Sequence, residues 1–166
     1  IMKKLQLGDI IISTPLLNNT NFEKTVIVIT EYNADGAIGL IINQPNEKYL
    51  NQLQEFAHCK PIPFYTGGPM DHEHIYMLHQ YATTIKNCEL VKEDVYWGGD
   101  FSNAIVLMQE LKDLQIKLCI GYCGWNANEL EAEIEEGSWI ITKANVSIVF
   151  TANTQTIWNE LYETCK

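Results

Sequence analysis

Apolar residues come in short, β-branched runs along most of the chain, and such runs predict buried strands. The run at residues 9–14 stops at Pro15, which cannot donate to a strand ladder. Residues 26–30 and 37–43 flank the sequence Asn-Ala-Asp-Gly at residues 33–36, which suits a hairpin turn. Both arms are apolar at successive positions rather than alternating, so we expect both faces of this hairpin to be covered.

Further apolar runs predict strands at residues 64–66, 75–79, 116–122, 139–142 and 147–150, and we expect Gly121 and Gly124 to end the third of these. Apolar residues at helical spacing predict helices at residues 49–56, 101–114, 126–136 and 156–163. Asn126, followed three residues later by Glu129, predicts the start of the third helix, and Gly137 predicts its left-handed end. Strands outnumber helices, so the pattern favours an α+β fold: a mixed, largely antiparallel sheet or small barrel-like sheet with surrounding helices.

Length and composition predict one domain over residues 1–166, because 46% apolar content over this length suits a single core. The longest apolar runs are far shorter than the roughly 20 residues that a membrane-spanning helix needs. Lys3 and Lys4 are followed by polar residues and Gly8, so we expect no signal peptide. Five scattered cysteines lack the spacing of a disulfide scaffold, which favours a cytoplasmic location. No cofactor is indicated, and the oligomeric state stays open.

The charge of the chain limits the kinds of partner that it can bind. The formal net charge is −10, and all eleven basic residues are lysines. Nucleic-acid binding depends on cationic contacts to phosphate, for which the bidentate guanidinium of arginine is especially suited. We therefore expect no direct DNA binding, and a protein partner or a small ligand instead.

Four segments resemble the YqgE/AlgH family, and together they extend over nearly the whole chain. They are residues 8–15 with 21–22 and 25–26, residues 36–45, residues 67–70 with 78–79, and residues 121–125 with 130–134 and 137–139. The last segment is the most specific, since it sets glycines, aromatic residues and acids at fixed distances. The family usually has a basic residue where this chain has Gln44, and Gly where it has Asn128, a residue type that tolerates a left-handed backbone.

The resemblance implies a compact α+β fold with a small barrel-like sheet, in a family that is largely uncharacterised and sometimes labelled a transcriptional regulator. We therefore expect a binding or regulatory domain that affects transcription indirectly, through a protein partner or a small ligand. The alternative is an enzyme that acts on a small molecule at a pocket beside the glycine turns. The two differ in whether the matching segments converge on a concave pocket.

Glycine turns, polar residues and one tryptophan form the candidate binding surface. Glycine turns offer backbone N–H groups to an anion, but glycine pairs also serve simply to allow positive φ where a strand ends. The acidic helix at 126–136 is either a solvated face or an edge that meets a basic partner. The candidate residues are Asn43, Gln44, Pro45, Gly67, Gly68, Pro69, Gly99, Asp100, Trp125 and Glu131.

For two sets of these residues we predict where they lie in the fold. Residues 43–45 should leave their strand at the same end of the molecule as residues 67–69, because both are short turns that end buried strands. The Trp125 ring should pack beside the first turn of the acidic helix, since Gly121 and Gly124 leave room for it.

His72, His74 and His79 are the candidate metal ligands, since His72 and His74 would share one face of a strand. A solvated polar turn explains residues 71–74 equally well, and a histidine on an apolar strand is typical of a hydrogen-bonded core residue. No further ligand stands at motif spacing, so no metal is assigned. We expect Cys119 and Cys123 to be buried thiols that act as small apolar side chains.

Overall fold

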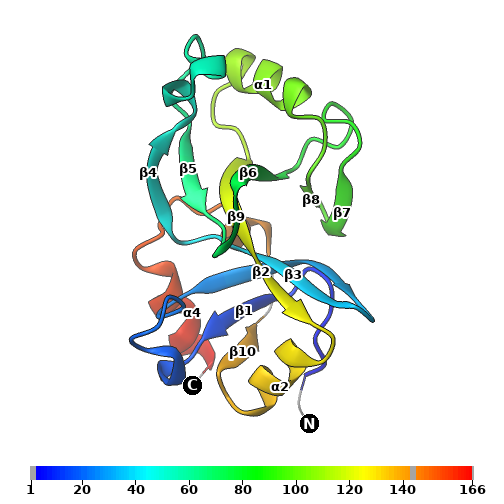
Figure 1. The fold of residues 1–166 in the computed structure, drawn as a ribbon, viewed down its shortest axis with the longest axis vertical. Coiled ribbons are helices and arrows are strands. Elements are labelled where there is room, and N and C mark those ends of the chain that lie inside the picture. Colours follow the sequence, from blue (N-terminus) through cyan, green and yellow to red (C-terminus); the bar gives the residue numbers. More distant parts are fainter. Residues whose placement is uncertain (1–2, 143–144, 166) are drawn as a thin grey trace.

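The computed structural model describes residues 3–142 and 145–165, and its architecture is α+β (Figure 1). The helices are α1 Phe101–Glu110, α2 Glu129–Glu135, α3 Val146–Val149 and α4 Ile157–Cys165. The strands are β1 Ile10–Ser13, β2 Val26–Asn33, β3 Gly36–Ile41, β4 Pro45–Tyr49, β5 Pro63–Thr66, β6 Met70–His79, β7 Glu89–Lys92, β8 Val95–Trp97, β9 Ile116–Asn126 and β10 Trp139–Thr142.

The strands form one mixed sheet in the order β10-β1-β2-β3-β9-β6-β8-β7, with β5 also paired to β9 and β4 to β5. β5 and β9 run parallel, whereas the other pairs among the described residues are antiparallel. The prediction of a mixed, largely antiparallel sheet is therefore confirmed.

β9 joins two groups of strands that lie one above the other in Figure 1. Its end, residues 123–126, pairs with β3 in the lower group, which also contains β1, β2 and β10. Its beginning pairs with β5 and β6 in the upper group. A single long strand thus fixes the position of one group relative to the other.

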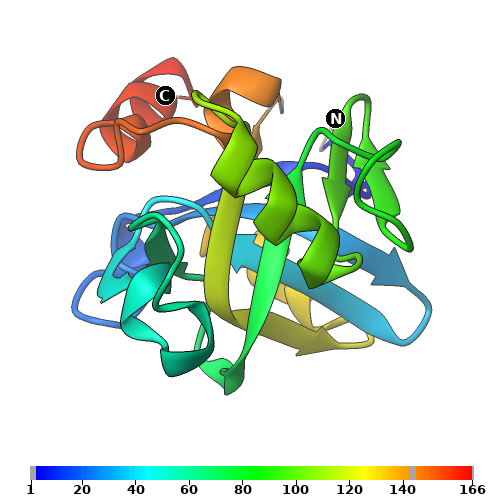
Figure 2. The same ribbon diagram turned by 90° about the horizontal axis from the view of Figure 1, so that it is seen from above.

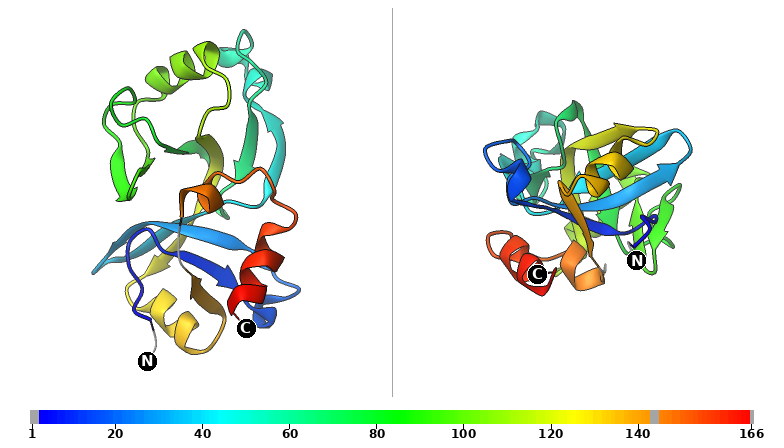
Figure 3. Two further views of the ribbon diagram at one scale, coloured as in Figure 1. Left: turned by 180° about the vertical axis from the view of Figure 1, so that it is seen from behind. Right: turned by 90° about the horizontal axis from the view of Figure 1, so that it is seen from below.

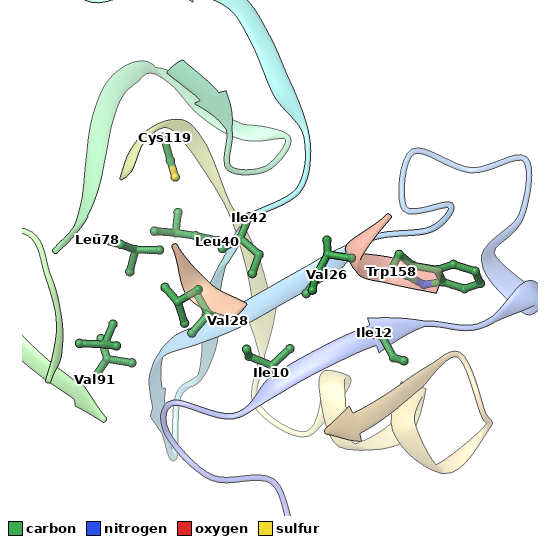
Figure 4. Close-up of a cluster of buried hydrophobic side chains, with 13 residues drawn as sticks. Ile10, Ile12, Val26, Val28, Leu40, Ile42, Leu78, Val91, Cys119 and Trp158 are labelled. Carbon is green, nitrogen blue, oxygen red and sulfur yellow. The ribbon is translucent and has the colours of Figure 1, made fainter. Parts of the chain in front are cut away.

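The hairpin of β2 and β3 is covered on both faces, as its apolar pattern predicts. Val26 and Val28 belong to a buried cluster that Trp158 of α4 joins (Figure 4). Ile27 and Leu130 of α2 belong to the cluster on the opposite face. The first cluster also contains Leu78 of β6 and Val91 of β7, so it joins the lower group of strands to the upper one.

The upper group has a separate core, which α1 covers. Ala104 and Leu107 of α1 are buried in one cluster with Met77 of β6 and Leu118 of β9. Figure 2 shows α1 lying over these two strands. The predicted helix at 101–114 is confirmed over Phe101–Glu110 and ends at Leu111, whose backbone is extended. No helix in residues 3–142 or 145–165 has the length and apolar character needed to span a membrane.

α2 begins three residues later than predicted. Asn126 is the last residue of β9, and the residue that precedes the helix is Asn128, in the left-handed conformation with φ 68°. The Glu129 carboxylate accepts the Asn126 backbone N–H at 2.9 Å, which ties the end of β9 to the helix. The predicted end is confirmed: Gly137 has φ 92° and donates its N–H to the Ile134 carbonyl.

The predicted strand at residues 147–150 is wrong, because Val146–Val149 forms the short helix α3. The side-chain oxygen of Asn145 accepts the Ile148 N–H at 2.9 Å and the Ser147 hydroxyl at 2.6 Å. This N-terminal cap outweighs the strand preference of valine and isoleucine.

The predicted helix at residues 49–56 is instead two 3-10 turns, Leu50–Gln52 and Gln54–Phe56. Leu53 separates them, because its φ of −80° and ψ of 132° are extended. The apolar pattern also fails to predict β4, β7 and β8. These strands are short or polar and lie towards the edges of the sheet, where no apolar run marks them.

β9 continues through Gly121 and Gly124 instead of ending there. Gly121 has φ 80°, and a Cβ at this position would lie 2.5 Å from the Gly68 carbonyl oxygen, so glycine permits a close approach of two backbones. Opposite it, the pairing of β6 with β9 is interrupted at residues 71–74. These residues are an irregular part of β6 rather than a free polar turn.

Candidate functional site

Two of the predicted turn segments lie side by side. The Thr66 N–H donates to the Gln44 carbonyl oxygen at 2.8 Å, and the Ile41 N–H donates to the Gly67 carbonyl oxygen at 2.8 Å. The segments border a hollow of about 280 Å³ lined by Asn21, Phe22, Ile41, Gln44, Thr66, Gly68, Pro69 and His72. Residues 43–45 and 67–69 therefore lie together, as expected, where β3 leads into β4 and β5 leads into β6.

The glycines at this hollow are explained by close packing of the backbone. A Cβ at Gly67 would lie 2.3 Å from the Gly121 carbonyl oxygen, and a Cβ at Gly68 would lie 2.1 Å from the Tyr122 carbonyl carbon. Any side chain at these two positions would push the segment away from β9. Contact between neighbouring segments therefore accounts for both glycines without a ligand.

Asn43 and Pro45 have roles in strand geometry. The Asn43 side chain accepts the Val26 N–H at 2.9 Å and donates to the Lys24 carbonyl oxygen at 2.9 Å, so it fixes the start of β2. Pro45 begins β4 and pairs with Tyr65 of β5. Of the residues 43–45, Gln44 is the one that lines the hollow.

Gly99 and Asp100 lie at the start of α1, far from α2 at the opposite end of the molecule (Figure 1). Gly99 has φ 110°, and a Cβ there would lie 2.7 Å from Ile85. Both oxygens of the Asp100 carboxylate accept from the Asn87 side-chain amide, each at 3.2 Å. Neither residue lines the hollow at Gly68, so the structure does not bring the ten candidates onto one surface.

Trp125 and Glu131 hold α2 against the sheet. The half-buried Trp125 ring meets Trp139 edge to face, with ring centroids 6.2 Å apart. The Glu133 carboxylate accepts both indole N–H groups, from Trp125 at 3.3 Å and from Trp139 at 2.9 Å. Glu131 accepts the Tyr32 hydroxyl at 2.8 Å. Trp125 packs on α2, but through Glu133 rather than at the expected first turn of the helix. Three of the acids on this helix, Glu129, Glu131 and Glu133, have structural partners.

Each of the three candidate histidines is engaged within the protein. His72 Nε2 lies 2.7 Å from the Gly68 carbonyl oxygen, and His74 Nδ1 lies 2.7 Å from the Asp71 carboxylate. His79 is buried between the Gly98 carbonyl oxygen and the Tyr81 N–H, which fixes it as a core residue. Burial lowers the pKa of His79, against the effect of its hydrogen bond to Gly98. Among the described residues, no group of three or more potential ligands is placed to hold a metal ion.

A larger cavity, of about 530 Å³, lies between β5, the connection from α1 to β9 and the segment that follows α3. Figure 3 shows that segment, in orange, crossing the back of the molecule where the two groups of strands meet. The polar residues of the lining are Lys60, Tyr65, Lys112, Asp113 and Lys117. The apolar residues are Ile62, Pro63, Met108, Leu111, Leu114, Ile116, Phe150 and Ala152.

Lys117 is the buried charged residue of this cavity, with 3% of its surface exposed. Its Nζ donates to the Ile42 carbonyl oxygen at 2.7 Å and to the Thr151 carbonyl oxygen at 3.4 Å. The Nζ also lies 4.3 Å from the centre of the Tyr65 ring, a cation–π contact. In the part of the chain that the structure describes, no carboxylate forms an ion pair with it.

Burial lowers the pKa of Lys117 to about 8, and the neighbouring Cys119 thiol partly opposes this effect. The amine is therefore still largely protonated at neutral pH. Burial also raises the pKa of Cys119 and of Cys123 to about 12, so both thiols stay protonated and unreactive near neutrality. The expectation that they are buried is confirmed.

The sequence prediction missed Lys117, although a signal is present. Residues 116–120 read Ile-Lys-Leu-Cys-Ile, so a lysine interrupts a run predicted to be a buried strand. Lysine is almost never fully buried in proteins unless it is paired. A lysine at such a position therefore indicates a special environment, but the distant segments that complete the cavity cannot be read from this pattern.

The fold and the contacts described above define an α+β protein whose family-specific residues mainly hold its strands and α2 together. The chain matches the AlgH-like family over residues 10–166 and belongs to it. The resemblance seen in the sequence is thereby confirmed.

Curated relatives and solved structures agree with this membership. A UPF0301 protein of Chlorobium luteolum is 33% identical over 159 residues, covering 95% of this chain and 84% of the relative. A UPF0301 protein of Cytophaga hutchinsonii is 33% identical over 158 residues, covering 93% and 86%. The solution structure of the AlgH protein from Pseudomonas aeruginosa has a TM-score of 0.73 and 26% identity, covering 90% of this chain and 85% of that one. A crystal structure of a Corynebacterium diphtheriae protein has a TM-score of 0.81 at 17% identity, which shows the shared fold.

Proposed function

We propose that this chain is a binding and regulatory domain that holds a small ligand in the cavity at Lys117. The observation that carries the proposal is a cavity of about 530 Å³ with largely apolar walls and one buried ammonium. Small-molecule sites are typically concave, mostly apolar and supplied with a few placed polar groups, in the range of about 300–1,000 Å³. The hollow at Gly68 is smaller, at about 280 Å³.

The position of the cavity supports a regulatory role. Phe150 and Ala152 of its wall belong to the segment that leads to α4. Trp158 of α4 donates its indole N–H to the Ser13 carbonyl oxygen at 2.9 Å, at the end of β1. A ligand that contacts Phe150 would therefore stabilise the segment that connects α3 to α4. A partner protein that binds the surface of the C-terminal segment would then recognise this change.

A partner protein is the route by which such a domain would affect transcription. The net charge of −10 and the lack of arginine oppose direct contact with DNA phosphates. We place the protein in the cytoplasm, where free cysteines are kept reduced.

Catalysis at the glycine turns is not favoured by the geometry. The imidazole at that hollow, His72, has its Nε2 engaged by the Gly68 carbonyl, and no hydroxyl or thiol is hydrogen-bonded to it in the described residues. General acid–base or nucleophilic catalysis needs a reactive group within hydrogen-bond reach of its base. Binding without reaction is therefore the function that we propose.

The test is an NMR screen of the labelled protein against fragments of anionic, neutral and cationic types. We expect shifts to cluster at cavity residues such as Ile116 and Phe150. Ala152→Trp should fill the cavity and abolish these shifts, whereas Ala127→Trp, at an exposed position beside α2, should leave them unchanged. No shifts from any charge class, or shifts confined to other surfaces, would overturn the proposal.

A further inference from the structure

We propose that the ligand of the Lys117 cavity is a small carboxylate with an apolar body, an inference that rests on the proposed function. A molecule of this kind combines one negative charge for the ammonium with a hydrocarbon part for the walls.

Among the described residues, the partners of the Lys117 ammonium are all neutral groups. Its hydrogen bond to the Ile42 carbonyl is short, but the one to Thr151 is 3.4 Å, near the limit for such a bond. The Tyr65 ring supplies the remaining contact. A buried charge is strongly disfavoured unless an opposite charge accompanies it. A carboxylate entering the cavity would supply the missing charge and replace the long Thr151 contact.

The charged residues around the cavity also favour an anion. Lys60, Lys112 and Lys117 line it together with a single acid, Asp113, so three positive charges minus one negative charge leave a local formal charge of +2. The whole chain has a formal charge of −10. This cavity is thus a positive site on an acidic protein, and a cationic ligand would be repelled from it.

The walls require that most of the ligand be apolar. Ile62, Met108, Leu114, Ile116 and Phe150 all face the space beside the amine. A small polar anion would leave these side chains in contact with water, whereas a hydrocarbon body would cover them. A monoanionic carboxylate also matches one buried ammonium better than a phosphate ester, which carries close to two negative charges at neutral pH.

Binding of the carboxylate should depend on pH through Lys117. The titratable groups that face or adjoin the amine are Tyr65 from β5, Cys119 from β9, and Lys60, Lys112 and Asp113 at the cavity. Burial raises the pKa of Tyr65 and raises that of Cys119 to about 12, so neither loses its proton between pH 7 and pH 9.5. Lys117, with a pKa of about 8, does lose its proton in this range.

The experiment compares octanoate, 1-octanol and octylamine by calorimetry or NMR titration on the full chain. We expect octanoate to bind at least about tenfold more tightly than either neutral or cationic analogue at pH 7. Lys117→Met should remove this preference, whereas Lys4→Met, which changes an exposed lysine outside the cavity lining, should preserve it. Octanoate affinity for the parent should fall at least about fivefold between pH 7 and pH 9.5, and octanol affinity should stay constant.

The pH series on the parent protein keeps the inference testable even if Lys117→Met does not fold. Equal affinities for octanoate and octanol, or an unchanged octanoate affinity at pH 9.5, would overturn the carboxylate inference. Tighter binding of octyl phosphate than of octanoate would also overturn it. In each of these cases a positive fragment screen would leave the proposed function intact, so failure of the inference and failure of the function are distinguishable.

Discussion

Lys117→Met should change how the free energy of unfolding depends on pH. Burial lowers the pKa of Lys117 from 10.5 to about 8 in the folded protein. Between these values the unfolded chain holds a proton that the folded chain has released, so the folded state gains stability as pH rises through this window. Below pH 8 the amine is protonated in both states, and its contribution no longer changes with pH.

The difference between 10.5 and about 8 corresponds to about 3 kcal/mol when titration is complete. About 2 kcal/mol of this is gained between pH 7 and pH 9.5, by integration of the two titration curves. The parent should therefore gain about 2 kcal/mol relative to Lys117→Met over that interval. The variant itself loses hydrogen bonds to two carbonyls, so its stability at a single pH is the less informative quantity.

Urea unfolding of both proteins at pH 7 and pH 9.5 gives the measurement. The raised pKa values of Cys119 and Cys123 act in the opposite direction above pH 9, because the unfolded thiols ionise first. These groups are present in both proteins, so their effect largely cancels in the difference. If the parent and the variant change by the same amount, within about 0.5 kcal/mol, the Lys117 amine is not desolvated as described.

The remaining predictions concern α2 and nucleic acid. Glu133→Ala should lower the free energy of unfolding by about 1–3 kcal/mol in chemical unfolding, because two indole N–H groups lose their acceptor. Glu135→Ala, which changes an exposed residue of the same helix, is the matched control, and an equal loss of stability in both variants would contradict the reasoning. Trp125→Ala should cost about 2 kcal/mol, less than a fully buried ring, and a thermal melt within about 1 °C of the parent would sink the packing role. The protein should not bind duplex DNA at physiological salt in fluorescence anisotropy, and submicromolar, salt-sensitive binding would disprove this.

Much of the fold could be predicted because its central strands carry long apolar runs. β1, β2 and β3 and the turn between β2 and β3 follow directly from residues 9–43. The helix α3 could not, since its valines and isoleucine favour a strand and the Asn145 cap decides the outcome locally. The predicted strand at residues 116–122 is shorter than β9, because glycine commonly marks the end of a strand. In the structure, Gly121 instead permits the close approach of the Gly68 backbone.

The candidate site was less predictable than the fold. The matching segments led to Gln44 and Gly68, which do meet at one hollow, but their close contacts explain them as parts of the fold. The Lys117 cavity depends on segments from residues 60–65, 108–117 and 150–152, which are distant in sequence. Only the folded chain brings these segments together, and a lone lysine in an apolar run does not identify its neighbours.

The long strand β9 also sets a condition on how the chain folds during synthesis. β3, β5 and β6 all precede it in the sequence, and each has an edge that β9 alone covers among its described partners. A nascent chain that has left the ribosome only as far as residue 115 therefore carries three strands with open edges, which are sites of non-native association. The sheet can close only after residues 116–126 emerge, so the interval before their release is the time at which this protein most needs protection from aggregation.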